Sequence, residues 1–217
     1  MRLTKLGHAC VRLEKDGATL VVDPGTWSGP EALDGADAVL VTHEHFDHVD
    51  VDGVRAALRA NPHLRVWTHA GVAAQLGAGS DEDGGERVRV VRAGDRFECA
   101  GFEVSVHGAE HALLHKEIPV VPNVGFLVDH EVFHPGDSFT VPDERVRTLL
   151  LPVDAPWLKA SELIDYARAV APERAYAIHD AMVNEKGAMV VDNWLGVAAR
   201  PLDATFTRLQ PGTGVDL

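Results

Sequence analysis

The sequence predicts an α/β (α+β) protein built as a four-layer αββα sandwich, in which two β-sheets pack face to face and helices cover both outer surfaces. Three observations favour this fold. Short apolar segments separated by turn residues open the chain, and a second series of them follows near its middle, a pattern typical of β-meanders. Amphipathic segments with helix-starting and helix-ending residues occur in both halves, so each sheet has helices available to cover it.

The first half of the chain combines an opening meander with later strands and helices. The segment 36–42 is apolar and rich in β-branched residues, which predicts a buried strand. Asp50 or Asp52 is suited to begin the helix that follows, and Asn61-Pro62 ends it. We expect strands over residues 2–6, 9–14, 18–22, 36–42 and 65–68, and helices over residues 54–60 and 72–76.

The second half again begins with short strands and continues with helices. Ser161 is predicted to cap one amphipathic helix, which Ala171-Pro172 ends. We expect strands over residues 87–91, 97–99, 102–106, 124–128, 132–133, 148–151, 175–178 and 205–209, and helices over residues 162–170 and 186–197. A length of 217 residues and a hydrophobic content of 46% suit one domain over residues 1–217.

Composition and charge narrow the class of partner. A net charge of −13 disfavours a nucleic acid or an anionic membrane as partner, because both require a basic surface. No apolar run approaches a membrane span, and the first residues lack a signal core, so we expect a cytoplasmic protein that acts on a small molecule. Cys10 and Cys99 have no neighbouring cysteine at metal-binding spacing and are predicted as buried apolar side chains. The sequence leaves the oligomeric state open.

Six consecutive residues carry the strongest functional signal. They read His43-Glu44-His45-Phe46-Asp47-His48 and directly follow the strand predicted over 36–42. Packing of a helix or strand does not require three imidazoles and a carboxylate in one turn, whereas these side chains are suitable ligands for divalent metal ions. Because ligands of open α/β sheets bind at the carboxyl ends of strands, the sequence predicts a metal site here.

Further candidate ligands stand at the ends of other predicted strands. Asp23 ends the strand over 18–22, Asp137 closes the segment after the strand over 132–133, and His179 ends the strand over 175–178. One more histidine is needed, and the sequence offers His107, His111 and His115.

With these motifs in place, the chain resembles the metallo-β-lactamase-fold hydrolase superfamily. His43-x-His45-x-Asp47-His48 matches the hallmark motif of that superfamily, and Gly136-Asp137 matches its Gly-Asp motif. Asp23 and His179 match the early aspartate and the last histidine, so the resemblance extends from the first strands to about residue 185. Within the superfamily, the chain looks similar to the compact single-domain branch of ascorbate-phosphate lactonase-like proteins and uncharacterised zinc-dependent hydrolases.

The resemblance implies a site for two metal ions. It assigns His43, His45 and a middle histidine to the first metal, Asp47, His48 and His179 to the second, and Asp137 to both. Asp23 would support a ligating imidazole, since a carboxylate fixes the tautomer of the ring that it contacts. Members of the superfamily carry the middle histidine in a loop past a strand end, which selects His111 and leaves His107 as the alternative and His115 as the third choice.

Two more residues receive weaker assignments. His8, in Gly7-His8-Ala9, resembles a Gly-His pair near the N-terminus of the compact branch, and it either lines the site or bonds to the backbone. Asp180 either orients a ligand or caps the segment after it. The loop from Pro152 to Trp157 either forms a pocket wall or places Trp157 in the core.

The predicted chemistry is hydrolysis with a hydroxide that bridges two divalent ions. Zinc is the expected metal, with manganese and iron as alternatives, because imidazole and carboxylate ligands do not select one metal firmly. The expected substrate is a small ester, lactone, amide or phosphodiester, including anionic ones, and Asp47 or Asp137 would carry the proton. Two alternatives stay open: a mononuclear iron persulfide dioxygenase, and a metal-binding protein without catalysis. His45 stands where the flavodiiron branch carries glutamate, which disfavours oxygen reduction.

Overall fold

The first sheet combines the opening meander with the parallel strands that follow it. The computed structural model describes residues 1–80 and 84–217. The strand order is β14-β1-β2-β3-β4-β5-β6, antiparallel from β14 to β3 and parallel from β3 to β6. The strands are β1 Arg2–Gly7, β2 Cys10–Lys15, β3 Ala18–Val22, β4 Ala38–Val41, β5 Arg65–Thr68, β6 Val88–Val90 and β14 Gly214–Asp216.

The second sheet has the same plan, with strand order β13-β12-β11-β10-β9-β8-β7. Here the pairs from β7 to β10 are antiparallel, and the pairs from β10 to β13 are parallel. The strands are β7 Arg96–Cys99, β8 Phe102–His107, β9 Gly125–Val128, β10 Val132–His134, β11 Thr148–Pro152, β12 Arg174–Ile178 and β13 Thr205–Thr207.

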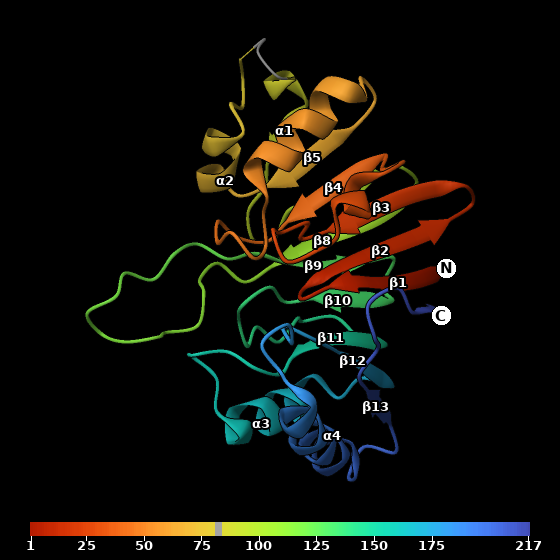
Figure 1. Ribbon diagram of the computed structural model, residues 1–217, viewed down its shortest axis with the longest axis vertical. Helices are drawn as coiled ribbons and strands as arrows, with labels where there is room; N and C mark the ends of the chain where they lie inside the picture. Colours follow the sequence, from red (N-terminus) through yellow and green to blue (C-terminus); the bar gives the residue numbers. More distant parts are fainter. Residues whose placement is uncertain (81–83) are drawn as a thin grey trace.

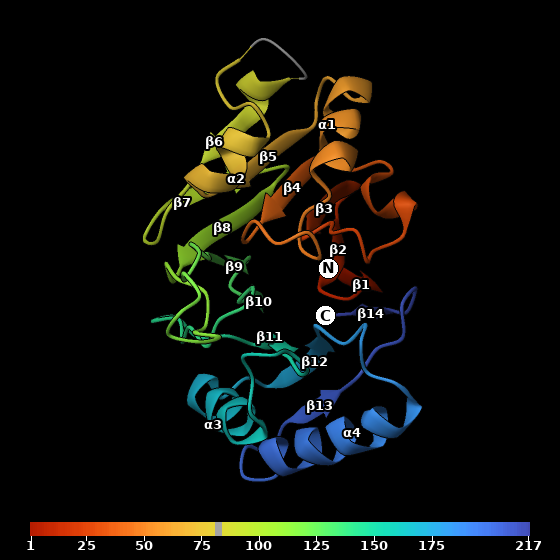
Figure 2. The same cartoon turned by 60° about the vertical axis from the view of Figure 1, so that its left-hand side comes forward.

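Helices cover the outer face of each sheet, which confirms the predicted four layers (Figure 1). In Figures 1 and 2, α1 and α2 lie at the end occupied by the first sheet, and α3 and α4 lie at the opposite end. The helices are α1 Val51–Ala60, α2 Ala70–Gln75, α3 Ala160–Val170 and α4 Glu185–Ala199, with short 3₁₀ turns at Pro30–Leu33 and Gly85–Arg87.

Within the part of the chain that the structure describes, three apolar clusters hold the layers together. The central cluster lies between the sheets and includes Leu13 and Phe126, both fully buried. A second cluster packs α1 and α2 on the first sheet through residues such as Leu58. A third packs α3 and α4 on the second sheet through Leu163 and Leu195. Burial of this apolar surface provides the main driving force for folding.

Several element boundaries differ from the predicted ones. Helix α1 begins at Val51, three residues before the prediction, because the Asp50 carboxylate accepts a hydrogen bond from the Gly53 N–H and caps the helix there. The predicted capping role of Ser161 is wrong: α3 already begins at Ala160. The Lys159 N–H instead donates to the Glu162 side chain at 3.1 Å.

The ends of β1, β3, β4, β8, β10 and β12 lead into the loops that carry the candidate site residues. Within residues 1–80 and 84–217, the structure contains no helix with the length and apolar character needed to cross a membrane.

Candidate metal centre

The loop after β4 is held in a fixed shape by the loop after β3. The Thr26 N–H donates to the Phe46 carbonyl oxygen at 2.8 Å. The Asp50 N–H donates to the Pro24 carbonyl oxygen at 2.9 Å. Gly25 is required at this crossing, because a Cβ atom there would lie 1.9 Å from the Asp47 carbonyl oxygen. The close approach of two backbones therefore fixes the position of the histidine-rich loop.

Two of the candidate residues have left-handed backbone at the end of a strand. Asp23 has a φ angle of 51° and His179 a φ angle of 57°. Such values are uncommon for residues other than glycine, and they concentrate at functional sites. Both side chains are buried, with exposed fractions of 0% for Asp23 and 3% for His179.

The candidate ligands form two neighbouring groups of four residues, and Asp23 forms a third group with His43 and His48. In each group, the nitrogen and oxygen atoms that can bind metal lie within 4.8 Å of one another. Of the two larger groups, one contains His43, His45, His111 and Asp137, and the other contains His8, Asp47, His48 and His179. Apart from His8, these are the residues that the resemblance to the superfamily assigns to the two metals.

Asp137 lies between the two groups. Its carboxylate oxygens are 3.0 Å from Nε2 of His48, 3.1 Å from Nε2 of His179 and 3.3 Å from Nε2 of His111. Nε2 of His43 is 3.9 Å away. One carboxylate thus faces histidines of both groups, which is the arrangement that a residue shared by two metal ions requires.

The tautomers of three histidines follow from the partners of Nδ1. His111 Nδ1 donates to the Ala112 carbonyl oxygen and His179 Nδ1 donates to the Asp154 carbonyl oxygen, both at 2.6 Å. His48 Nδ1 lies 2.6 Å from the Asp23 carboxylate. Because these oxygens only accept, the ring proton occupies Nδ1 in each case and Nε2 carries a lone pair when the ring is neutral.

These lone pairs test whether metal ions fit the site. Among the described residues, Nε2 of His48, His111 and His179 and Oδ1 of Asp137 are buried and have no hydrogen-bond partner. A carboxylate that faces three nitrogen lone pairs requires positive charge between them, supplied by extra protons or by metal ions. Imidazole nitrogens and carboxylate oxygens at this spacing are ligands for divalent ions, so the residues fit a metal centre.

The charges of the site shift its pKa values strongly. Burial would lower the pKa of His48, but Asp137 and Asp23 raise it well above its usual value. Burial would raise the pKa of Asp137, but His48 and the other facing histidines hold it well below its usual value. For His43, burial dominates and lowers the pKa well below its usual value. Strong, opposite shifts in one cluster are typical of functional sites.

The structure distinguishes among the three histidines considered for the middle position. Among the described residues, neither group includes His107 or His115. His107 Nε2 lies 2.9 Å from the Ser105 hydroxyl, and His115 is on the exposed part of the loop between β8 and β9. Of the three, only His111 belongs to the group around His43, and its role as the middle ligand stays a prediction.

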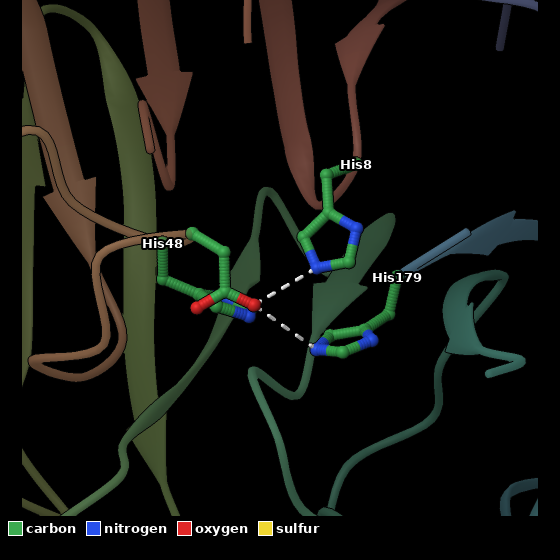
Figure 3. A group of neighbouring side chains, drawn as sticks. His8, His48 and His179 are labelled. Carbon is green, nitrogen blue, oxygen red and sulfur yellow. Dashed lines mark hydrogen bonds and ion pairs between the residues drawn. The ribbon is translucent and has the colours of Figure 1, made fainter. Parts of the chain in front are cut away.

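The two residues with weaker assignments have different surroundings. His8 lies within the second group, with Nε2 3.1 Å from Asp47 Oδ2, and Figure 3 shows His8, His48 and His179 converging from different segments. Asp180 instead pairs with the buried Lys5 ammonium at 2.5 Å. Asp180 was predicted either to orient a ligand or to cap the segment after it, and the contact that its carboxylate makes here is with this lysine.

Three more residues contact the site: Trp157, for which the sequence left a pocket wall or a core position open, and Asn123 and Thr42, which it did not single out. The Trp157 indole N–H donates to Asp137 Oδ2 at 3.1 Å, and Asn123 Oδ1 accepts from the Asp137 N–H at 2.9 Å. Both the backbone N–H and the hydroxyl of Thr42 donate to the Asp23 carboxylate. Trp157 is buried, as core packing predicts, but its polar edge also contacts the carboxylate between the two groups.

Paired mixed sheets with outer helices, and a histidine and aspartate centre at the strand ends, define a metalloprotein of the metallo-β-lactamase fold. Residues 2–179 match the family model described as a beta-lactamase superfamily domain. The chain belongs to this superfamily, as its motifs predicted. The narrower resemblance to ascorbate-phosphate lactonase-like proteins stays a prediction.

Curated relatives and solved structures agree with this membership. Protein Rv0786c of Mycobacterium tuberculosis is 42% identical over 189 residues, which cover 84% of this chain and 85% of that protein. A UPF0173 metal-dependent hydrolase of Aeropyrum pernix is 31% identical over 161 residues, or 67% of this chain and 64% of that protein. Igni18, a metallo hydrolase from Ignicoccus hospitalis, has the same fold, with a TM-score of 0.73, 18% identity and coverage of 99% of this chain and 97% of that one.

Proposed function

We propose that the protein is a dinuclear metal-dependent hydrolase that cleaves a small ester, lactone, amide or phosphodiester. The observation that carries this proposal is the position of Asp137, whose one carboxylate faces histidines of two complete ligand groups. Relatives named metal-dependent hydrolases, such as the protein of Aeropyrum pernix, support the same reaction class.

Each group would hold one ion. The first ion would bind His43, His45 and His111, the second would bind Asp47, His48 and His179, and Asp137 would contact both. Two such ions lower the pKa of a water molecule held between them and polarise the bond that is cleaved. We propose zinc as the resident metal, because four-coordinate sites of imidazole and carboxylate are typical of it, with manganese and iron as the alternatives.

The charge and exposure of the site support a small substrate that approaches from one side. Asp47 and Asp137 contribute two negative charges against the charges of two divalent ions, so an anionic group is attracted even though the whole chain carries −13. Asp47 and His45 are partly exposed, whereas Asp137 is buried. Asp47 is therefore the carboxylate placed to exchange a proton with a substrate or with solvent, and Asp137 the one placed to hold the ions.

An aromatic pair borders this side of the site. Trp27 and Phe46 are exposed by 38% and 60%, and their ring centroids lie 5.4 Å apart in an edge-to-face arrangement. The Trp27 ring also contacts the His8 ring, with centroids 4.7 Å apart. Apolar surface next to the partly exposed ligands supports a substrate that carries an uncharged, apolar substituent beside the bond to be cleaved.

The test is elemental analysis of the purified protein, followed by assays with p-nitrophenyl esters, a lactone and a bis-p-nitrophenyl phosphodiester. We expect two zinc ions per chain, hydrolysis of at least one class, loss of activity on chelation and its recovery on reloading. The Asp137→Asn variant should lose activity, while His107→Asn should keep it. One iron per chain together with oxygen consumption on a thiol persulfide would overturn the proposal, as would no turnover of any class at full metal occupancy.

A further inference from the structure

His8 connects three segments at the edge of the metal centre. It follows β1 directly and is only 2% exposed. Its Nε2 atom lies 3.1 Å from Asp47 Oδ2, in the loop after β4. Its Nδ1 atom accepts a hydrogen bond from the Ala181 N–H at 3.2 Å, and its carbonyl oxygen accepts one from the His179 N–H at 2.9 Å, both in the loop after β12.

These partners determine which ring nitrogen of His8 carries the proton. The Ala181 backbone N–H can only donate, so Nδ1 must present its lone pair. The proton of the neutral ring then occupies Nε2, where the Asp47 carboxylate can only accept. This tautomer is the reverse of that of neutral His48 and His179, whose Nδ1 atoms face a carboxylate and a carbonyl oxygen and whose Nε2 atoms carry the lone pair.

The packing of the His8 ring disfavours a flip that would change which ring atoms face Asp47 and Ala181. The His8 ring packs on the His179 ring, with centroids 4.0 Å apart, and on the edge of Trp27. A flip of the ring would replace Nδ1 with a carbon atom against the Ala181 N–H and leave that donor without its acceptor. An unsatisfied buried donor is unfavourable, so the contacts on both nitrogens favour the same orientation.

We propose that His8 is a positioning residue for the second ion and not one of its ligands, although its Nε2 atom lies among the ligand atoms of that group. The Nε2–H holds the Asp47 carboxylate, while Nδ1 and the backbone carbonyl oxygen hold the His179 loop, so one residue sets the distance between two ligands that follow strands of different sheets. This inference rests on the proposed dinuclear centre, since it assigns Asp47 and His179 to one ion.

The first test is zinc titration of the metal-free protein by calorimetry, with variants that separate the two roles. His8→Phe keeps a ring but removes the two polar contacts of the side chain. The affinity of this variant for the second zinc equivalent should fall about 10- to 100-fold, while its affinity for the first equivalent should be unchanged. His8→Gln retains an amide donor near the position of Nε2 and should recover most of that loss. His107→Phe, which alters a histidine outside both groups, serves as the matched control and should bind both equivalents normally.

The second test reads the tautomer directly and requires no variant to fold. Long-range ¹H–¹⁵N correlation spectra of the zinc-loaded protein, labelled with ¹⁵N-histidine, should show His8 with a proton on Nε2 and none on Nδ1. Coordination through Nε2, or equal zinc affinities for the wild type and His8→Phe, would overturn the inference. Neither measurement uses turnover, so a chain that binds two zinc ions and cleaves no substrate would contradict the hydrolase proposal alone. A chain that takes up no second zinc ion would overturn both.

Discussion

His48 Nδ1 lies 2.6 Å from the Asp23 carboxylate, and both side chains are fully buried. The opposite nitrogen, Nε2, lies 3.0 Å from Asp137 Oδ1. The imidazole is therefore held between two carboxylates, one supplied by the end of β3 and the other by the loop after β10. The Asp23 carboxylate is held in turn by the backbone and the hydroxyl of Thr42, so these protein contacts orient the His48 ring.

Replacement of Asp23 by Asn should lower the affinity of the protein for the second metal ion. The amide can still accept from Nδ1–H but carries no charge, so the His48 ring becomes a poorer ligand, and we expect metal affinity to fall about 10- to 100-fold. Calorimetric titration of the metal-free variant measures this fall. Asp37→Asn is a matched control, because that exposed carboxylate also accepts from a backbone N–H, at 2.9 Å, but lies on the surface. Unchanged affinity in Asp23→Asn would contradict the assigned role.

Variants at His111 and His107 should differ in the number of metal ions that they bind. His111→Ala removes one ligand of the group around His43, and we expect it to retain one ion per chain in elemental analysis. His107→Ala should retain two, because its ring contacts Ser105 and Glu144 instead. The reverse result would show that the middle ligand has been assigned to the wrong histidine.

The Trp157→Phe substitution should lower the affinity of the protein for both metal ions, whereas Asp23→Asn should lower the affinity for the second ion. The substitution removes the indole N–H that contacts Asp137 Oδ2 but keeps an aromatic ring packed on Phe139. Because Asp137 faces both groups, we expect the affinity for each zinc equivalent to fall about tenfold, at the lower end of the range for such supporting contacts. Trp194→Phe, on α4, is the control, and a change confined to one equivalent would argue against a shared carboxylate.

Metal removal should lower the thermal stability of the protein. A site that is filled at a free metal concentration about 100 times its Kd stabilises the fold by about 2.7 kcal/mol. For a chain of this size, each kcal/mol corresponds to about 2–4 °C in Tm, so chelation should lower Tm by several degrees per site. Differential scanning calorimetry with and without chelator measures the difference, and a Tm independent of metal would be incompatible with a bound pair of ions.

The two cysteines should be unreactive in the folded protein. Burial raises the pKa of Cys99 to about 12 and raises that of Cys10 further. Since the thiolate is the reactive form, little of it exists at pH 8, and iodoacetamide should label neither residue in native conditions. Both should react fully in denaturant, as mass spectrometry can verify. Rapid labelling of the native protein at pH 8 would show that one of these thiols is accessible.

The sequence located most of the candidate site because strand ends are visible in it. His43 to His48, Asp137 and His179 all follow apolar segments rich in β-branched or aromatic residues, and the structure brings them together. The contacts that orient these ligands could not be predicted from the sequence. His111 and His179 donate to carbonyl oxygens of Ala112 and Asp154, and a backbone carbonyl is present at every position whatever its side chain.

Contacts between distant segments account for the other differences. The partner of the Trp157 indole is 20 positions away, in the loop after β10, so the local pattern indicated a pocket-wall or core position for Trp157 but not this contact. Strand β14 has three residues and no apolar alternation, and it forms only through pairing with β1. Both depend on tertiary contacts that overrule the local preference of the chain.

The pairing of β14 with β1 also bears on the order in which the protein can assemble during translation. Arg2, Leu3 and Thr4 are synthesised long before their partners, Asp216, Val215 and Gly214. Until those residues are synthesised, one edge of the first sheet presents unpaired backbone groups, which are prone to pair with other chains. A nascent chain therefore has its histidine-rich loop long before this edge is closed, and interrupted synthesis would release products at risk of aggregation.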